Sequence, residues 1–202
     1  MTAIEAIRSG DLDGLKALLA VDAAAVDERD ENGVPAAMLA LYLRQRACAD
    51  ALIEAGAAVD FPLACALGLA EEVVRFLDAC PELLAERTAD GWTPLHLAAF
   101  FGQPAVAGLL ISRGADVLAR STNKMENLPI HAAAAARQAA IVELLLDAGT
   151  PANATQHGGY TALHSAAQNG DQATLNLLLL RGGDMNLAAD DGKTPAQLLP
   201  AA

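Results

Sequence analysis

The sequence predicts an all-α solenoid in which short helix–turn–helix units stack side by side. One reason is a repeat of about 33 residues. Three histidines recur at spacings of 35 and 33 residues: His96, His131 and His164. Three glycines keep the same two spacings: Gly114, Gly149 and Gly182. The second reason is size, because one such unit cannot bury its own apolar face and must stack against neighbours like itself.

The best copy of the repeat opens with a turn and a short helix. Asp90-Gly91 is a turn dipeptide. Thr93 is a good helix cap, and Pro94 fits the first helical position because its missing N–H would have no partner there. Residues 95–101 are almost all apolar or small, which predicts an enclosed helix that Gly102 ends.

A second helix follows within the same copy. Pro104 opens it by the same rule, and the pattern runs to about Arg113. Three apolar residues share one face at i, i+3 and i+4 spacing: Val106, Leu109 and Leu110. Gly114 suits the left-handed cap at the end of the helix.

Charge and polarity exclude two classes of partner. No formally charged residue occurs between Trp92 and Ser112, which is long enough to suggest a membrane span, but the Gly-Gln-Pro break would interrupt such a helix. We therefore expect no membrane partner. The net charge of −12 disfavours nucleic acid, whose phosphates require Lys and Arg, and is compatible with a basic protein partner.

Four partial copies of one motif carry a resemblance to a known family. They read DGWTPLHLAAFFG at 90–102, NLPIHAAAAAR at 127–137, GYTALHSAAQNG at 159–170 and DGKTPAQLL at 191–199. Over nearly its whole length, the chain resembles an ankyrin-repeat protein. The Ala-rich, Lys-poor composition suggests a bacterial source.

The resemblance implies one domain, 1–202, an ankyrin solenoid with hairpin-like fingers between its helix pairs. Its units are expected at 1–27 (an N-terminal cap), 28–60, 61–87, 88–120, 121–154, 155–187 and 188–202 (a C-terminal half-unit). The third departs from the pattern, because it has no DGxT turn and Phe61-Pro62 leads almost directly into a helix, so its finger should be missing or stunted. The fifth carries two extra residues in its loop.

We expect that the protein is not an enzyme and that it binds neither a metal nor a cofactor. The repeated histidines would lie about one helix spacing apart, on the order of 10 Å, whereas zinc ligands each lie about 2 Å from the ion. In the family this histidine is structural. No GxSxG, HExxH, Walker-type or GxGxxG motif occurs. A small-molecule or hydrolytic site around Cys65 and His96 is a remote alternative.

The resemblance also indicates where a partner binds. In the family, the residue between Gly and Thr of the turn and the two before the inter-helix Gly face the concave groove. One Trp, two Tyr and four Phe make up the aromatics, and five of these rings fall on such positions. The candidate contact residues, including an arginine at an inter-helix turn, are Val34, Tyr42, Leu43, Trp92, Phe100, Phe101, Arg137, Tyr160, Gln168 and Asn169. The alternative is that the rings pack among themselves.

The predicted function is therefore binding of a partner protein through the concave face, without chemistry. Trp92, Phe100 and Phe101 are the expected anchors, since rigid rings bury a large area at little entropic cost. An inhibitor or immunity-type protein that blocks a toxin or enzyme is the alternative. Because no signal peptide is evident and the three cysteines form no CxxC pair, we expect a cytoplasmic protein. We also expect a monomer.

Overall fold

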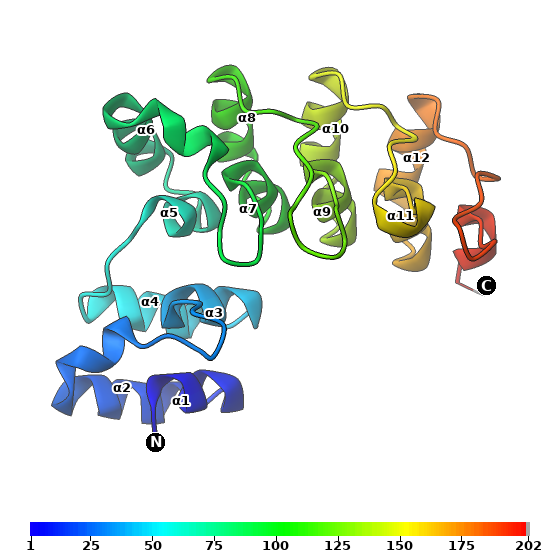
Figure 1. Cartoon of the computed structure of the whole chain (residues 1–202). Helices are drawn as coiled ribbons and strands as arrows, with labels where there is room; N and C mark the ends of the chain where they lie inside the picture. The colour runs from blue at the N-terminus through cyan, green and yellow to red at the C-terminus, as the bar shows by residue number, and fades with distance from the viewer. Residues whose placement is uncertain (201–202) are drawn as a thin grey trace. The chain divides into compact units, whose positions relative to one another are not determined.

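The computed structural model describes residues 1–200 and confirms the all-α fold class. Over those residues the chain forms twelve α-helices joined by loops and short 3-10 turns, with isolated bridges in place of strands (Figure 1). By its internal contacts, the chain groups into two compact units, Met1–Leu63 and Ala64–Ala202. Each unit is described by itself, and the single domain stays a prediction.

The first unit contains two helix pairs. Its elements are α1 (Ala3–Ser9), α2 (Leu12–Val21), η1 (Ala23–Asp27), α3 (Ala36–Tyr42) and α4 (Arg46–Glu54). Thr2 starts α1 with a capping box, since its hydroxyl accepts from the Glu5 N–H while the Glu5 carboxylate accepts from the Thr2 N–H. Ile7, Leu15 and Leu52 are fully buried and form the core of this unit.

A finger connects η1 to α3, as the Asn32-Gly33 turn predicts. Arg29 and Pro35 form a β-bridge, and Gly33 has a φ of 78° at the turn. The Asp30 carboxylate accepts from the backbone N–H groups of Asn32 and Val34, both at 2.9 Å. These bonds, together with its low exposure beside Arg8, assign Asp30 to the turn itself rather than to a solvated acidic edge.

The second unit is a longer stack. Helix α5 (Phe61–Leu67) crosses the boundary between the units. The remaining elements are α6 (Ala70–Ala79), η2 (Pro81–Ala85), α7 (Pro94–Phe100), α8 (Pro104–Ser112), α9 (Pro129–Ala135), α10 (Ala139–Asp147), η3 (His157–Gly159), α11 (Ala162–Gln168), α12 (Gln172–Leu180) and η4 (Pro195–Leu198). Helices α7, α9 and α11 pack in one row, and α6, α8, α10 and α12 in a second row behind them (Figure 1).

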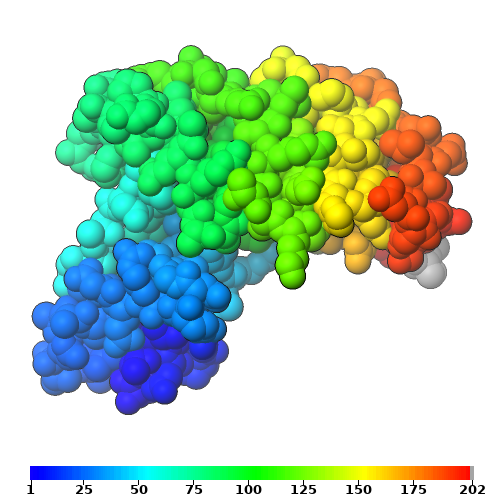
Figure 2. All heavy atoms as spheres, viewed as in Figure 1, coloured from blue at the N-terminus to red at the C-terminus, as the bar shows by residue number. Residues whose placement is uncertain are grey.

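The third repeat lacks a finger, as its sequence predicts. Helix α5 begins directly after Asp60, whose carboxylate accepts from the Leu63 N–H at 2.9 Å. The later fingers are closed by a backbone hydrogen bond across their base: Thr88 to Trp92, Ser121 to Asn127, Gln156 to Tyr160 and Ala189 to Lys193. The Ser121–Asn127 finger is two residues longer than the other three, and its tip protrudes in the space-filling view (Figure 2).

Burial in the second helix of each repeat differs in part from the apolar stripe in the sequence. In α8, Val106 and Leu110 are fully buried, while Leu109 is only half-buried. The same holds in α10, where Leu145 is fully buried. The face that enters the core is therefore set by Val106 and Leu110, with Leu109 at its margin.

The inter-helix turns contain a feature that the sequence did not indicate. Most of these turns place a glycine in the left-handed region, as at Gly102 (φ 71°), but Arg44 and Arg137 occupy it with φ values of 59° and 62°. A side chain in this region costs about 1 kcal/mol relative to glycine. Arginine is therefore tolerated at these two turns at the expense of stability.

We expect Arg44→Gly to raise the free energy of unfolding by about 0.5 kcal/mol at most, because glycine relieves the left-handed strain and loses part of that gain to its freer unfolded chain. Ala47→Gly is the matched control, since Ala47 is exposed within α4 and glycine there should cost about 1 kcal/mol. Urea unfolding measures both changes. A loss of stability in Arg44→Gly would contradict the strain argument.

Candidate protein-binding site

The three repeated histidines hold neighbouring repeats together. Each ring accepts a backbone N–H at Nδ1 from the residue that begins its own helix: Thr93, Leu128 and Thr161. The proton therefore sits on Nε2. That nitrogen donates to a backbone carbonyl 23 to 31 residues farther along the chain: Asn127 at 2.9 Å, Ala154 at 2.9 Å and Lys193 at 3.2 Å. The structural role predicted for these histidines is confirmed.

Burial also keeps these histidines neutral. It lowers the pKa of His96 and of His131 to about 4, because the charged imidazolium would lose its hydration. The pKa of His164 is lowered for the same reason. At neutral pH these histidines are therefore uncharged, and each acts as both a hydrogen-bond donor and an acceptor.

Backbone hydrogen bonds link successive fingers as well. The Thr122 N–H donates to the Gly91 carbonyl at 3.1 Å, and the His157 N–H donates to the Met125 carbonyl at 2.9 Å. These bonds fix the fingers against one another, so that side chains on them are held at defined positions above the helices of the front row.

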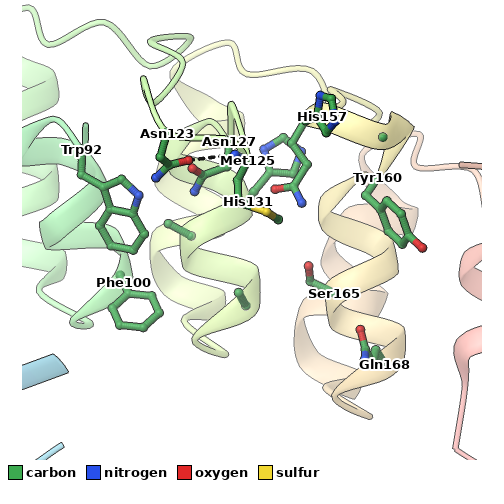
Figure 3. A pocket seen from close by; sticks show the side chains of 14 residues that line it. Trp92, Phe100, Asn123, Met125, Asn127, His131, His157, Tyr160, Ser165 and Gln168 are labelled. Carbon is green, nitrogen blue, oxygen red and sulfur yellow. Dashed lines mark hydrogen bonds between the residues drawn. The ribbon is translucent and has the colours of Figure 1, made fainter. Parts of the chain in front are cut away.

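The fingers and the front helices enclose an open hollow of about 580 Å³ (Figure 3). It spans the repeats of α7, α9 and α11. Its lining residues are Trp92, Phe100, Asn123, Met125, Asn127, His131, Ala132, Ala135, Gln156, His157, Gly158, Tyr160, Ser165 and Gln168. Below, "the hollow" means the surface made by these residues.

Trp92 and Phe100 form one aromatic wall of the hollow, whereas Phe101, the third predicted anchor, is not among its lining residues. The ring centroids of Trp92 and Phe100 lie 5.1 Å apart, at an interplanar angle of 69°. Phe101 packs against Phe100 with centroids 5.2 Å apart and nearly perpendicular rings. Both are favourable edge-to-face arrangements. All three side chains remain half-buried, so the rings pack among themselves and still present surface outside.

Tyr160 stands at the far end of the hollow, at the base of the Gln156–Tyr160 finger (Figure 3). Its hydroxyl donates to the Asp191 carboxylate at 2.9 Å, and its ring lies 5.0 Å from the His164 ring. Asp191 also pairs with Lys193, and these contacts lower the pKa of Asp191 to about 2. The Tyr160 ring is thereby fixed in place, with its face available to the hollow.

The structure brings together some of the predicted contact residues and separates others. Four line the hollow: Trp92, Phe100, Tyr160 and Gln168. Three are in the first unit, where Val34 and Tyr42 are half-buried and Leu43 is 43% exposed. For these three, partner binding stays a prediction.

Two further predicted residues are tied into the stack. The Asn169 side-chain amide donates to the Ala135 carbonyl at 3.1 Å, and the Arg137 guanidinium donates to the Asn169 carbonyl. These bonds join the turns of neighbouring repeats. They give Asn169 and Arg137 a structural role beside the contact role predicted for them, which remains a prediction.

Several side chains of the hollow were not predicted from the sequence, above all Met125. This residue is 52% exposed on the two-residue-longer finger and lines the hollow. The signal was present, since the 35-residue spacing from His96 to His131 marks the insertion. What the spacing did not give is the direction in which the longer finger points.

Other kinds of site find little support in the structure. Within residues 1–200, no group of His, Cys, Asp and Glu is arranged to hold a metal, and no helix is long and apolar enough to cross a membrane. The alternative site at Cys65 and His96 lacks an available base, because both His96 nitrogens are engaged and both side chains are fully buried.

Comparison with known proteins agrees with the repeat architecture. A family model described as ankyrin repeats matches residues 3–121 and 119–189. Human B-cell lymphoma 3 protein is 36% identical over 109 residues, which cover 51% of this chain and 23% of that protein. Mouse NF-kappa-B inhibitor alpha is 35% identical over 100 residues, 46% of this chain and 31% of that protein.

An ankyrin repeat-containing protein of Schizosaccharomyces pombe is 44% identical over 50 residues, 25% of this chain and 24% of its own length. The chain thus spans less than a third of each of these relatives. All three come from eukaryotes, and a bacterial source for this chain stays a prediction.

Proposed function

Because this chain belongs to the ankyrin-repeat family, we propose that it binds a partner protein through the hollow of its second unit, without chemistry of its own. Trp92 and Phe100 serve as the anchors, with Met125 and Tyr160 as flanking contacts. The partner's identity is open, and the net charge of −12 favours one that is basic elsewhere on its surface.

The observation that carries this proposal is the half-buried Trp92–Phe100 pair at the wall of an open hollow. The scaffold does not require large rings there, because the equivalent positions of the next repeat hold Asn127 and Ala135. Rings of this kind are enriched among residues that dominate binding energy, since a partner can bury them at low entropic cost.

The names of the relatives also support a protein partner. The mouse relative is named as an inhibitor of NF-kappa-B, which is consistent with the alternative that this chain blocks the protein it binds. The match covers only 31% of that relative. Binding of a partner protein is therefore the main proposal, and inhibition of that partner is the more specific alternative.

The test is capture of partners from the source cells by wild type and by the double variant Trp92→Ala, Phe100→Ala. We expect the double variant to lose partners that wild type retains, because one such anchor contributes about 2 kcal/mol or more, roughly thirtyfold in affinity. Leu118→Ala is the matched control, since Leu118 is 48% exposed and outside the hollow. If a double variant with a wild-type circular dichroism spectrum captures every partner, the proposal fails.

A further inference from the structure

We propose that the segment bound in the hollow is extended and uncharged, about six residues long, with one apolar side chain seated against Trp92 and Phe100. This inference rests on the proposed function and deepens it by naming the chemistry of the partner segment. Three features of the hollow lead to it: the absence of Asp, Glu, Lys and Arg from its lining, the kind of polar side chains that can still bond to a partner, and its length.

The hollow is lined by no Asp, Glu, Lys or Arg side chain. Charged residues make up 19% of the sequence, yet none of the 14 lining residues is Asp, Glu, Lys or Arg. Its one buried histidine, His131, is neutral at pH 7 because burial lowers its pKa to about 4. A charged partner side chain placed there would lose hydration without gaining a counter-charge. An uncharged segment avoids that cost.

The polar groups of the hollow fall into two sets. Asn123 is already engaged, since its amide donates to the Asp90 carbonyl and its oxygen accepts from Met125. The side chains of Gln156, Ser165 and Gln168 line the hollow but are not used in the hydrogen bonds that hold the described residues together. Amides and hydroxyls both donate and accept, which suits the alternating N–H and C=O groups of an extended backbone.

The largest apolar surface of the hollow lies at its α7 end, away from Gln156, Ser165 and Gln168. Trp92 and Phe100 form the wall at α7, and Met125 extends over the middle from its longer finger, 52% exposed. Gln168 is the last residue of α11 (Figure 3). Gln156 directly precedes η3 in the same repeat. One segment can therefore place an apolar side chain at the α7 end and leave its backbone to the amides at the α11 end.

The length of the segment follows from the repeat. From α7 to α11 are two repeat steps of about 10 Å each, so that the hollow extends roughly 20 Å. An extended chain advances about 3.3 Å per residue, and about six residues therefore cover that span.

The first experiment selects binders from a displayed library of random eight-residue peptides on the full chain. A parallel selection uses the double variant Trp92→Ala, Phe100→Ala. We expect wild type to enrich peptides with an uncharged core of about six residues and one large apolar residue, and the double variant to lose them. If no peptide is enriched, the extended-segment inference is wrong. If both proteins enrich the same peptides, binding does not depend on Trp92 and Phe100, and the proposed function falls with this inference.

The second experiment measures the best selected peptide by Trp92 fluorescence against Ala135→Lys and Ala135→Glu. Ala135 is exposed and lines the hollow at the end of α9. Both substitutions should weaken binding at least tenfold, since either charge would be desolvated by an uncharged segment. The controls Ala105→Lys and Ala105→Glu, at an exposed position of α8 outside the hollow, should change it less than twofold.

The direction of the affinity changes in Ala135→Lys and Ala135→Glu shows whether this inference or the proposed function has failed. If one charge at Ala135 weakens binding and the opposite charge strengthens it, or if the selected peptides are rich in Lys and Arg, the partner segment is charged. The uncharged-segment inference would then be wrong, while binding that still depends on Trp92 and Phe100 would leave the proposed function standing.

Discussion

Leu145→Asp is expected to unfold the repeats around α10, with a loss of at least 4 kcal/mol in the free energy of unfolding. Leu145 is fully buried, and an aspartate there would remove its packing and bury a charge without a counter-ion. In a linear array each repeat is stabilised only by its neighbours, so the damage should spread to α8 and α12, which pack on either side.

The control for this variant is Leu180→Asp. Leu180 is 82% exposed at the end of α12, and a charge there should change stability by no more than about 0.5 kcal/mol. Thermal unfolding followed by circular dichroism compares the two, and hydrogen exchange shows where protection is lost. A wild-type melting curve for Leu145→Asp would be incompatible with α10 lying inside the stack.

Acid should destabilise the protein through its buried histidines. The folded pKa of His96 and of His131 is about 4, below the ordinary value of 6.5 for an unfolded chain. Above pH 6.5 both states are neutral, and the contribution is fully present. Between pH 6.5 and 4 only the unfolded state takes up protons, so stability falls by about 1.4 kcal/mol per pH unit for each histidine.

Urea unfolding at a series of pH values tests this slope. His131→Leu should be less stable at pH 7, because two hydrogen bonds are lost, but its stability should fall less steeply between pH 6.5 and 5. His157→Gln is the matched control for replacing a histidine, since the His157 side chain is exposed on its finger rather than buried between repeats. An identical slope in wild type and His131→Leu would overturn the assignment of the buried neutral state.

Much of the fold could be predicted because it is written in local, repeated signals. Thr93 and Pro94 begin α7 as capping chemistry predicts, and the His96 spacing locates the bonds between repeats. The missing finger before Phe61 was equally visible, since a turn that has no turn residues cannot form.

The contact surface was predictable only in part. Trp92 and Phe100 stood out because the repeat does not need them, and both line the hollow. Asn169 looked the same by that rule, yet its amide bonds to the Ala135 carbonyl, a partner 34 residues away. Contacts of this kind depend on how neighbouring repeats pack, which one repeat read by itself does not reveal.

The left-handed arginines show a different limit. Arg44 and Arg137 stand where other repeats have glycine, and their φ values of 59° and 62° follow the geometry of the turn rather than the preference of the residue. Here the packed helices on either side impose the conformation. The conformational preference of arginine alone would not predict a positive φ at either position.

The longer finger between Ser121 and Asn127 has a consequence for how this protein can change. Its two extra residues leave the closing Ser121–Asn127 hydrogen bond intact, and α9 still begins with Pro129 and its histidine bond. Lengthening a surface loop costs little free energy of folding, because the entropic cost of closing the loop grows slowly with its length. Insertions and deletions at this finger therefore offer a route to altered selectivity that bypasses the scaffold, in addition to the exchange of single side chains on the helices.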